Sequence, residues 1–455
     1  MKHIRVQRLW QHAFLAATVV VGSWNVALLS SSVLPAAQAA ARVKLSLYLY
    51  EGDTNTVDWV KKSIDQFEKA NPGVQIDIIT DSGSDYGAKL TTLWASGNPP
   101  DIWGQGGNVR TYVNQGWLLD LTRYVERDRE ELHPQEFFAS AWKAYQWDGK
   151  IWGIPFMSVG SFIYYNVDLL EQAGVNPPPV EWSKTGWTWD DMLTAARKAT
   201  VVGPDGKLKQ AGLGVEPSVY GSQVYSYMWG GDWFDTDTYR TGTPTRSTLS
   251  TPANIQAYQA VMDIIWKHHY SPQTGEAWAW FFQGKVAMYM GNGPWTIMGQ
   301  RSVLNFPWGL GAMPLAKTRA TIVYTDAWLI SSATKHPEEA WKFVKWLVSE
   351  PRLAAYIGLN DFPPARATVL GPYLSQLASF SRYHTPQQIL QALVGAQEYG
   401  HEALDHIING WDGISQRLTP IWNKMFANQI SVPTALQQGD EALNKYYAQL
   451  AARRQ

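Results

Sequence analysis

One tryptophan, Trp295, follows a turn of small residues that leaves the space in front of its ring open. Residues 286–290 alternate in character and predict a buried strand. The turn that follows, Gly-Asn-Gly-Pro at 291–294, fixes the backbone without bulky side chains and leads to Trp295. An indole ring presented in this way can stack on the flat face of a ligand. The alternative is that Trp295 packs in a core, as most aromatic side chains do.

The composition favours ligand contact for some of the aromatic residues. The chain contains 24 Trp, 22 Tyr and 14 Phe among 455 residues, and 17% of its residues are charged. A core can be filled by Leu, Ile and Val, which bury no side-chain N–H group. The many indoles therefore suggest a ligand that is apolar on its faces and polar at its edge. A sugar has both properties.

Polar side chains also follow the strands expected near the start of the chain. Strands at 43–50, 74–79 and 100–103 alternate with helices at 57–70 and before Gly97. This alternation predicts a mostly parallel α/β sheet, which binds ligands in the loops at the carboxyl ends of its strands. The residues expected in such loops are Glu51, Asp53, Ser84, Tyr86, Trp103, Gln105 and Asn108.

Two later segments combine aromatic and acidic residues. The sequence YSYMWGGDWFD, ending at Asp235, includes Trp229 and Asp232 beside two glycines. The strand-like run TIVYTDAWLIS contains Asp326 and Trp328. A charged residue within an apolar run indicates a crossover between lobes or a binding site. Both segments are therefore candidate regions of ligand contact.

Few residues match a catalytic or metal-binding pattern. His401 is followed by a second histidine five residues later, whereas a zinc-binding helix needs two histidines four apart. No G-x-S-x-G, Walker A or G-x-G-x-x-G motif occurs. Asp232 with Asp235, or Glu51 with Asp53, could instead flank a glycosidic bond, as the two carboxylates of a glycoside hydrolase do. Sugar cleavage is therefore the enzymatic alternative to sugar binding.

The first 39 residues have the pattern of an export signal. Three basic residues precede an apolar segment, and Ala37-Gln38-Ala39 matches a cleavage site. We expect a periplasmic protein cleaved near Ala39, and a retained membrane anchor is the alternative. Cleavage changes the net charge from −1 to about −4, because it removes three positive charges and no negative ones. This charge argues against a nucleic-acid partner, and the lack of cysteine excludes disulfides and thiolate metal sites.

Several sequence segments occur in the order found in one protein family. They are FEKANPGVQIDI, PDIW, NQGWLLDLT, WGIPF, YYNVDLLEQAGV, TWDDMLTAARKAT, GKVAMYMGNGPW, GLGAMPLAK, SSATKHPEEAWKFVKWLVSEP and FPPAR, and they run across nearly all of residues 43–370. This ordered set resembles the extracellular solute-binding proteins, family 1, of bacterial ABC importers, of the maltose- and trehalose-binding kind.

The resemblance implies an α/β, two-lobed periplasmic-binding-protein fold of type II. The ligand cleft would lie between the lobes, and the C-terminal part would be helical. The N-terminal lobe would comprise residues 43–158 and 326–368, and the C-terminal lobe residues 159–325 and 369–455. By the same resemblance, the ligand contacts would be Trp103, Trp229, Trp295, Trp328 with Asp326, and Trp411, with Arg366 and Asp53 as further matches.

The resemblance also implies a function. The chain would be a monomeric, non-catalytic receptor that binds a di- or oligosaccharide outside the cytoplasmic membrane. It would deliver the sugar to the membrane permease subunits of an ABC importer and need neither a cofactor nor a metal. Two alternatives stay open: a glycoside hydrolase, and the same fold binding a polyol phosphate or a polyamine.

Overall fold

The computed structural model describes residues 42–50, 54–81, 86–105, 107–273, 275–291, 295–357 and 362–452. The export-signal prediction for residues 1–39 lies outside these ranges. From Arg42 onward the chain forms one compact unit. Within the described residues, no helix is both long and apolar enough to cross a membrane.

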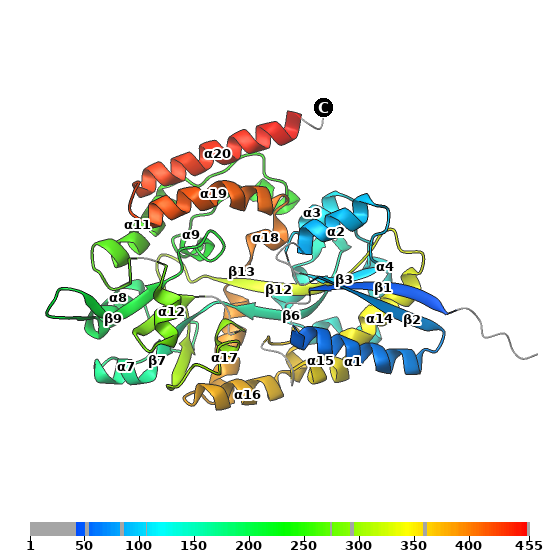
Figure 1. The fold of residues 1–455 in the computed structure, drawn as a ribbon, viewed down its shortest axis with the longest axis horizontal. Helices are drawn as coiled ribbons and strands as arrows, with labels where there is room; N and C mark the ends of the chain where they lie inside the picture. Colours follow the sequence, from blue (N-terminus) through cyan, green and yellow to red (C-terminus); the bar gives the residue numbers. More distant parts are fainter. Residues whose placement is uncertain are drawn as a thin grey trace, which may run out of the picture. The chain divides into compact units, whose positions relative to one another are not determined.

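The first sheet contains six strands and is shown in Figure 1. Its strand order is β13, β12, β3, β1, β2, and β6 pairs with β12 in addition. The strands are β1 (Val43–Tyr50), β2 (Val74–Asp81), β3 (Ile102–Gln105), β6 (Ile154–Gly160), β12 (Thr321–Ile330) and β13 (Gly400–Glu402). The strands β1, β2 and β3 are parallel, whereas β12 runs antiparallel to β3 and β6.

The second sheet contains five strands in the order β11, β7, β10, β9, β8. They are β7 (Phe162–Asn166), β8 (Val201–Val202), β9 (Leu208–Val215), β10 (Val286–Gly291) and β11 (Trp308–Gly311). The strands β9 and β10 are parallel, and β7 is antiparallel to β10 and β11. A separate hairpin is formed by β4 (Gln146–Trp147) and β5 (Lys150–Ile151).

Helices fill the connections. Up to β6 the chain forms α1 (Thr54–Ala70), α2 (Tyr86–Ala95), α3 (Val109–Asn114), α4 (Thr122–Arg127), α5 (Arg129–Leu132), η1 (Pro134–Glu136) and α6 (Ala139–Lys143). Between β7 and β11 it forms α7 (Val167–Gln172), α8 (Trp189–Ala199), α9 (Gln223–Met228), α10 (Thr236–Thr241), α11 (Pro252–Trp266), α12 (Ala277–Phe282) and α13 (Trp295–Met298). After β12 it forms α14 (Pro337–Leu347), α15 (Glu350–Ile357), η2 (Ala367–Val369), α16 (Gly371–Ser381), α17 (Pro386–Glu398), α18 (Leu404–Ile407), α19 (Trp411–Phe426) and α20 (Val432–Ala452).

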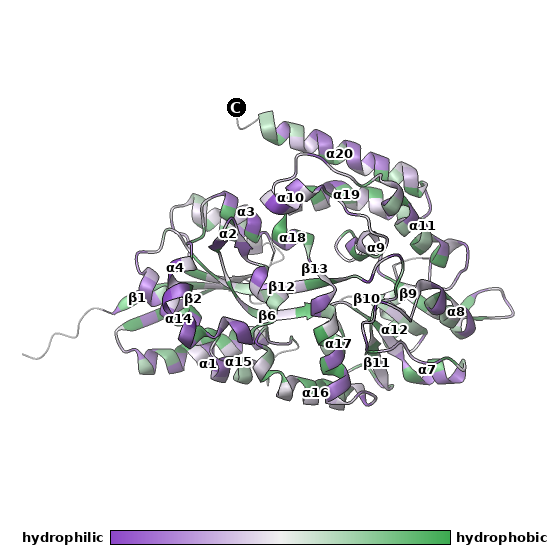
Figure 2. Ribbon diagram, turned by 180° about the vertical axis from the view of Figure 1, so that it is seen from behind, coloured by the Kyte–Doolittle hydropathy of each residue, from purple (hydrophilic) through white to green (hydrophobic). Residues whose placement is uncertain are grey.

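Local chemistry explains where these elements begin and end. Helix α8 starts with a reciprocal cap in which Thr188 Oγ1 accepts a bond from the Asp191 N–H and an Asp191 carboxylate oxygen accepts one from the Thr188 N–H. Helix α14 begins at Pro337, where a missing N–H costs nothing. In Figure 2 the strands β1 and β2 are mostly hydrophobic, while α20 alternates between hydrophilic and hydrophobic residues, as a half-exposed helix does.

The chain passes twice between the sheets through adjacent strands. Strand β6 of the first sheet is followed directly by β7 of the second, with Ser161 between them. The return runs from β11 of the second sheet to β12 of the first. We call each sheet with the helices between its own strands a body. The exact lobe boundaries, at 158 and 326, stay a prediction.

Gly160 gives a test of this packing. A Cβ atom at Gly160, the last residue of β6, would lie 2.4 Å from the Cβ of Ala396 on α17. We expect Gly160→Ala to lower the free energy of unfolding by about 1–3 kcal/mol, the usual cost of overpacking a core. Urea unfolding measures this change.

The matched control is Gly87→Ala on helix α2. A Cβ atom there would meet no atom closer than 3.9 Å. Alanine should leave the stability unchanged or raise it by about 0.5–1 kcal/mol, since glycine disfavours a helix. Equal effects of the two substitutions would contradict the described contact between β6 and α17.

Candidate functional site

An acidic side chain interrupts the strand that joins the two bodies. Asp326 is the one half-buried position in strand β12, whose other nine residues are buried. The pairing of β12 with β6 shifts register between Asp326 and Ala327, where Phe156 of the partner strand β6 is the extra residue of a β-bulge. A bulge redirects side chains and is common beside binding sites. Asp326 therefore carries a carboxylate to the place where the chain returns from the second sheet to the first.

Tyrosine side chains from both bodies lie within the electrostatic range of Asp326. They are Tyr86 at the start of α2, Tyr145 before the β4–β5 hairpin, and Tyr220 after β9 of the second sheet. Burial raises the pKa of each well above its ordinary value, and the charge of Asp326 raises it further. All three hydroxyls therefore stay protonated. That of Tyr145 donates to the carbonyl oxygen of Thr325, and that of Tyr86 to the carbonyl oxygens of Tyr48 and Gly104.

A histidine and two further carboxylates complete this group. His406 on α18 bonds through Nδ1 to Glu402 Oε1 at 2.5 Å, and its Nε2 lies 3.7 Å from Asp405 Oδ2. Glu402 also accepts bonds from the N–H and Oγ1 of Thr325, both at 2.9 Å. Burial alone would lower the pKa of His406, but Asp405, Glu402 and Asp326 outweigh it and raise the pKa to about 9. The imidazole is therefore a cation at neutral pH.

Within the described residues, three carboxyl groups surround one imidazole ring at this place: Asp405, Glu402 and Asp326 all act on the charge of His406. Burial raises the pKa of Asp405, and its Oδ1 is buried without a hydrogen-bond partner. The ring of Tyr220 stacks on Tyr324 of β12 with ring centres 5.2 Å apart. The group therefore offers carboxylate acceptors and phenol rings, which suits a ligand with many hydroxyls.

The structure brings together only part of the set predicted from sequence. Tyr86 and Asp326 were predicted and lie in this group. Tyr220, Glu402 and His406 were not predicted. Tyr220 could have been found by applying to β9 the rule used for the first sheet, because it lies in the loop at the carboxyl end of that strand. The carboxylate and the imidazole approach β12 from a distant part of the sequence, which no local pattern indicates.

Trp229 and Asp232 lie in the second body. Trp229 packs edge-to-face on Trp189, with ring centres 4.6 Å apart. An Asp232 carboxylate oxygen accepts bonds from the N–H of Trp233 and from the hydroxyl of Tyr239. Burial raises the pKa of Asp232 to about 6, and these bonds oppose the rise. Both residues stay predicted ligand contacts.

Three residues that were predicted to contact the ligand are buried in the first body. Trp103 and Trp328 have no exposed surface, and the ring of Trp328 stacks on Trp59 and Phe156. Arg366 is 2% exposed and pairs with Glu136 at 2.5 Å. This packing does not agree with the prediction that these side chains face a ligand. The physical reason is that each already fills a closed site inside the first body.

The other predicted residues divide into two groups. Trp411, the first residue of α19, is 6% exposed and stacks on Trp233. Asn108, whose side chain donates to Asp412 at 3.3 Å, lies next to it. Glu51, Asp53 and Ser84, and the side chains of Gln105 and Trp295, lie outside what the structure describes.

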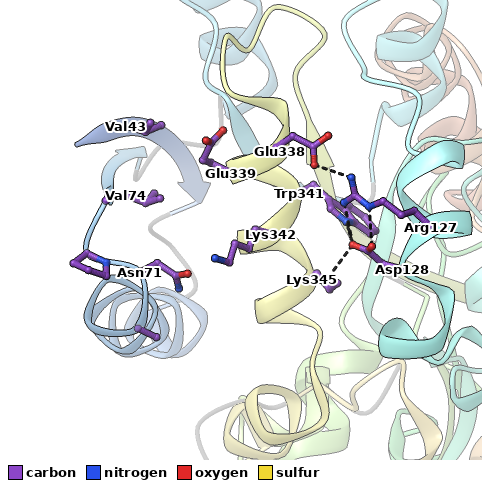
Figure 3. A pocket seen from close by; sticks show the side chains of 13 residues that line it. Val43, Asn71, Val74, Arg127, Asp128, Glu338, Glu339, Trp341, Lys342 and Lys345 are labelled. Carbon is purple, nitrogen blue, oxygen red and sulfur yellow. Dashed lines mark hydrogen bonds and ion pairs between the residues drawn. The ribbon is translucent and has the colours of Figure 1, made fainter. Parts of the chain in front are cut away.

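A cavity of about 670 Å³ lies at the opposite end of the first sheet (Figure 3). It is lined by Val43 and Val74, the first residues of β1 and β2, and by the start of α14. Asp128 within it is bonded to Lys345 at 2.8 Å and to the Trp341 N–H at 2.7 Å. Parallel sheets bind ligands at the carboxyl ends of their strands, so this cavity is not the candidate site.

Comparison with known proteins identifies the family. A family model described as bacterial extracellular solute-binding protein matches residues 53–351, and the chain belongs to this family. A binding protein of Brucella abortus is 26% identical over 359 residues, which cover 76% of this chain and 82% of that protein. A maltooligosaccharide ABC transporter solute-binding lipoprotein of Streptococcus pneumoniae is 24% identical, over 77% of this chain and 81% of that protein.

A solved structure supports the fold. An ABC substrate-binding protein from Listeria monocytogenes, in complex with cycloalternan, superposes with a TM-score of 0.73 at 22% identity. The match covers 90% of this chain and 99% of that chain. The predicted family and the α/β fold of type II periplasmic binding proteins are both confirmed.

His406 makes the stability of the site depend on pH. Its pKa is about 9 in the folded protein and 6.5 by default, so the folded state holds an extra proton between these values. Stability from this proton is complete below pH 6.5 and is lost as the pH rises through 9, on the order of 3 kcal/mol in total. We expect His406→Gln to flatten this decline, measured by urea unfolding at pH 6, 7.5 and 9.5.

His401→Gln is the matched control. Burial lowers the pKa of His401 below 6.5, so this residue binds no extra proton in the same pH window. Its variant should keep the decline of the parent protein. A His406→Gln profile parallel to that of the parent would show that His406 is not held as a cation by the surrounding carboxylates.

Proposed function

We propose that this chain binds a carbohydrate, of di- or oligosaccharide size, outside the cytoplasmic membrane and delivers it to the permease of an ABC importer. The observation that carries the proposal is the group around Asp326 on β12. The ring of Tyr220, from the second body, stacks on Tyr324, and the hydroxyl of Tyr86, from the first, donates to the carbonyl oxygen of Gly104 on β3, the strand paired with β12. A sugar bound there touches both bodies. It favours their closed arrangement by its differential affinity for that state.

Relatives support a sugar as the ligand. The names of related proteins include a maltotriose-binding protein of Pyrococcus abyssi and a multiple sugar-binding protein of Streptococcus mutans. The chemistry of the site agrees, because carboxylates and tyrosine hydroxyls suit the edge of a sugar and aromatic rings suit its faces. We place the protein in the periplasm as a monomer, with the N-terminal segment removed near Ala39.

The acidic charge of the site bears on the alternatives. A polyol phosphate would bring its negative charge next to Asp326 and Glu402, which costs several kcal/mol where water is excluded. Hydrolysis needs a carboxyl group free to transfer a proton. Both oxygens of Glu402 are instead bonded, to Thr325 and His406. Glu402 is therefore not free to act as the proton donor, and we propose binding without cleavage.

The test is a thermal-shift screen against malto-, manno- and cyclic oligosaccharides, followed by calorimetry on the best ligand. A ligand at 100 times its Kd adds about 2.7 kcal/mol of stability. We expect Asp326→Asn to raise the Kd of that ligand at least tenfold, because a hydrogen bond to a charged group contributes about 1.5–3 kcal/mol. Trp295→Ala should weaken binding by about 0.5–1.5 kcal/mol, the value of one stacked ring.

Asp263→Asn serves as the control for charge removal. Asp263 lies on the surface of α11 and pairs with Lys267. This variant should bind like the parent, and the sugar should be recovered intact after incubation. A response to spermidine or to glycerol phosphate, with none to any saccharide, would overturn the sugar proposal, and release of shorter sugars would favour the hydrolase.

A further inference from the structure

A cationic side chain of the first body is buried against the second. Arg110 lies on α3, which follows strand β3 of the first sheet, and is 3% exposed. Its Nε donates to the carbonyl oxygen of Thr241 at 2.9 Å, and its Nη2 donates to the same oxygen. Thr241 ends helix α10, between β9 and β10 of the second sheet. One guanidinium group therefore joins the two bodies.

The turn that receives Arg110 is shaped for it. Gly242, which follows Thr241, has a φ angle of 64°, a region that glycine adopts without strain. A Cβ atom on Gly242 would lie 2.3 Å from both Cγ and Nε of Arg110. Only a residue without a side chain leaves room for the arginine here. The carbonyl end of α10 also favours a nearby cation.

Further contacts continue along α3. The N–H of Asn108 donates to the Asp405 carbonyl at 2.7 Å, and the N–H of Gly410 donates to Thr111 Oγ1 at 3.0 Å. The side chain of Asn114 donates to Thr243 Oγ1 at 3.0 Å. Helix α3 therefore contacts the end of α10 and the start of α18, and the three helices lie close together in Figure 2.

We propose that Arg110 and the turn at Gly242 form a latch that holds the two bodies together and thereby sets the affinity for the ligand. Every contact of this latch is made between protein groups and needs no sugar. Nη1 of Arg110 is buried without a partner, so burial of this cation depends on the bonds that Thr241 accepts, together with Asp148 and the ring of Trp147 in its own body. When the bodies separate, water solvates the guanidinium, and the latch is lost.

The effect of Arg110 on the affinity for the ligand follows from thermodynamic linkage and rests on the proposed function. A ligand that prefers the closed arrangement binds more weakly when the closed fraction falls, in proportion to that fraction. Arg110 is thus a positioning residue, because it acts through the arrangement of the bodies. Its removal should raise the dissociation rate without lowering the association rate, since the open form is the one that admits the ligand.

The experiment measures the arrangement of the bodies directly. The chain has no cysteine, so Thr92→Cys and Lys207→Cys, both at exposed positions on different bodies, can carry a donor and an acceptor dye. Without any sugar, Arg110→Ala should lower the energy transfer between the dyes relative to the parent protein. The best saccharide should restore it, with a Kd raised about tenfold and a faster dissociation rate.

Three variants separate the latch from a general effect on folding. Gly242→Ala is a change in the second body, and its Cβ would displace Arg110. It should therefore lower the energy transfer as Arg110→Ala does. Asp148→Asn removes the 3.5 Å ion pair that Arg110 makes within its own body, and it should change neither energy transfer nor Kd. Arg110→Lys, which keeps the charge, should recover part of both.

The outcomes are distinct for the two proposals. Unchanged energy transfer in folded Arg110→Ala and Gly242→Ala proteins would overturn the latch, whatever the ligand is. Reduced transfer without sugar, restored by no saccharide, would support the latch and count against the proposed ligand. Should Arg110→Ala fail to fold, Gly242→Ala and Arg110→Lys decide the matter by the same measurement.

Discussion

Burial of a carboxylate in strand β12 is the constraint on which the centre of this molecule depends. A charge that loses water must be matched by nearby donors or cations, because its desolvation costs several kcal/mol. The charge of Asp326 acts on the tyrosines 86, 145 and 220 and on the imidazolium of His406. They come from both bodies, because β12 is the strand on which the chain returns from one sheet to the other. The candidate site and the joint between the bodies are therefore the same place.

This arrangement bears on how much each residue contributes to the free energy of ligand binding. Micromolar binding needs about 8 kcal/mol, whereas a stacked aromatic ring adds about 0.5–1.5 kcal/mol beyond its buried area. Hydrogen bonds to charged groups contribute about 1.5–3 kcal/mol each, so the carboxylates should matter at least as much as the indoles. The ligand takes no part in some contacts between the bodies, such as that of Arg110 with Thr241. These contacts also contribute to the binding free energy, although no list of sugar contacts would include them.

The sequence predicted the elements better than it predicted the side chains around the site. Strand β1 was expected at 43–50 and forms there, because alternation and turn residues act locally. Asp326 and Trp328 were both expected to contact the ligand. The extra residue at the register shift is Phe156 of β6, so β12 keeps its alternation, and Trp328 packs on Trp59 and Phe156 in the core. A bulge depends on the neighbouring strand, as does the approach of His406, and neither has a signature in the local sequence.

The central claim is that a sugar binds at Asp326 between the two bodies. The most direct measurement is a crystal structure of the protein with an oligosaccharide that stabilises it. The account predicts sugar hydroxyls within hydrogen-bond distance of Asp326 and contacts with at least one residue of each body, Tyr86 or Tyr220 among them. A sugar that contacts one body only, or that lies in the cavity beside Asp128 and Lys345, would contradict it.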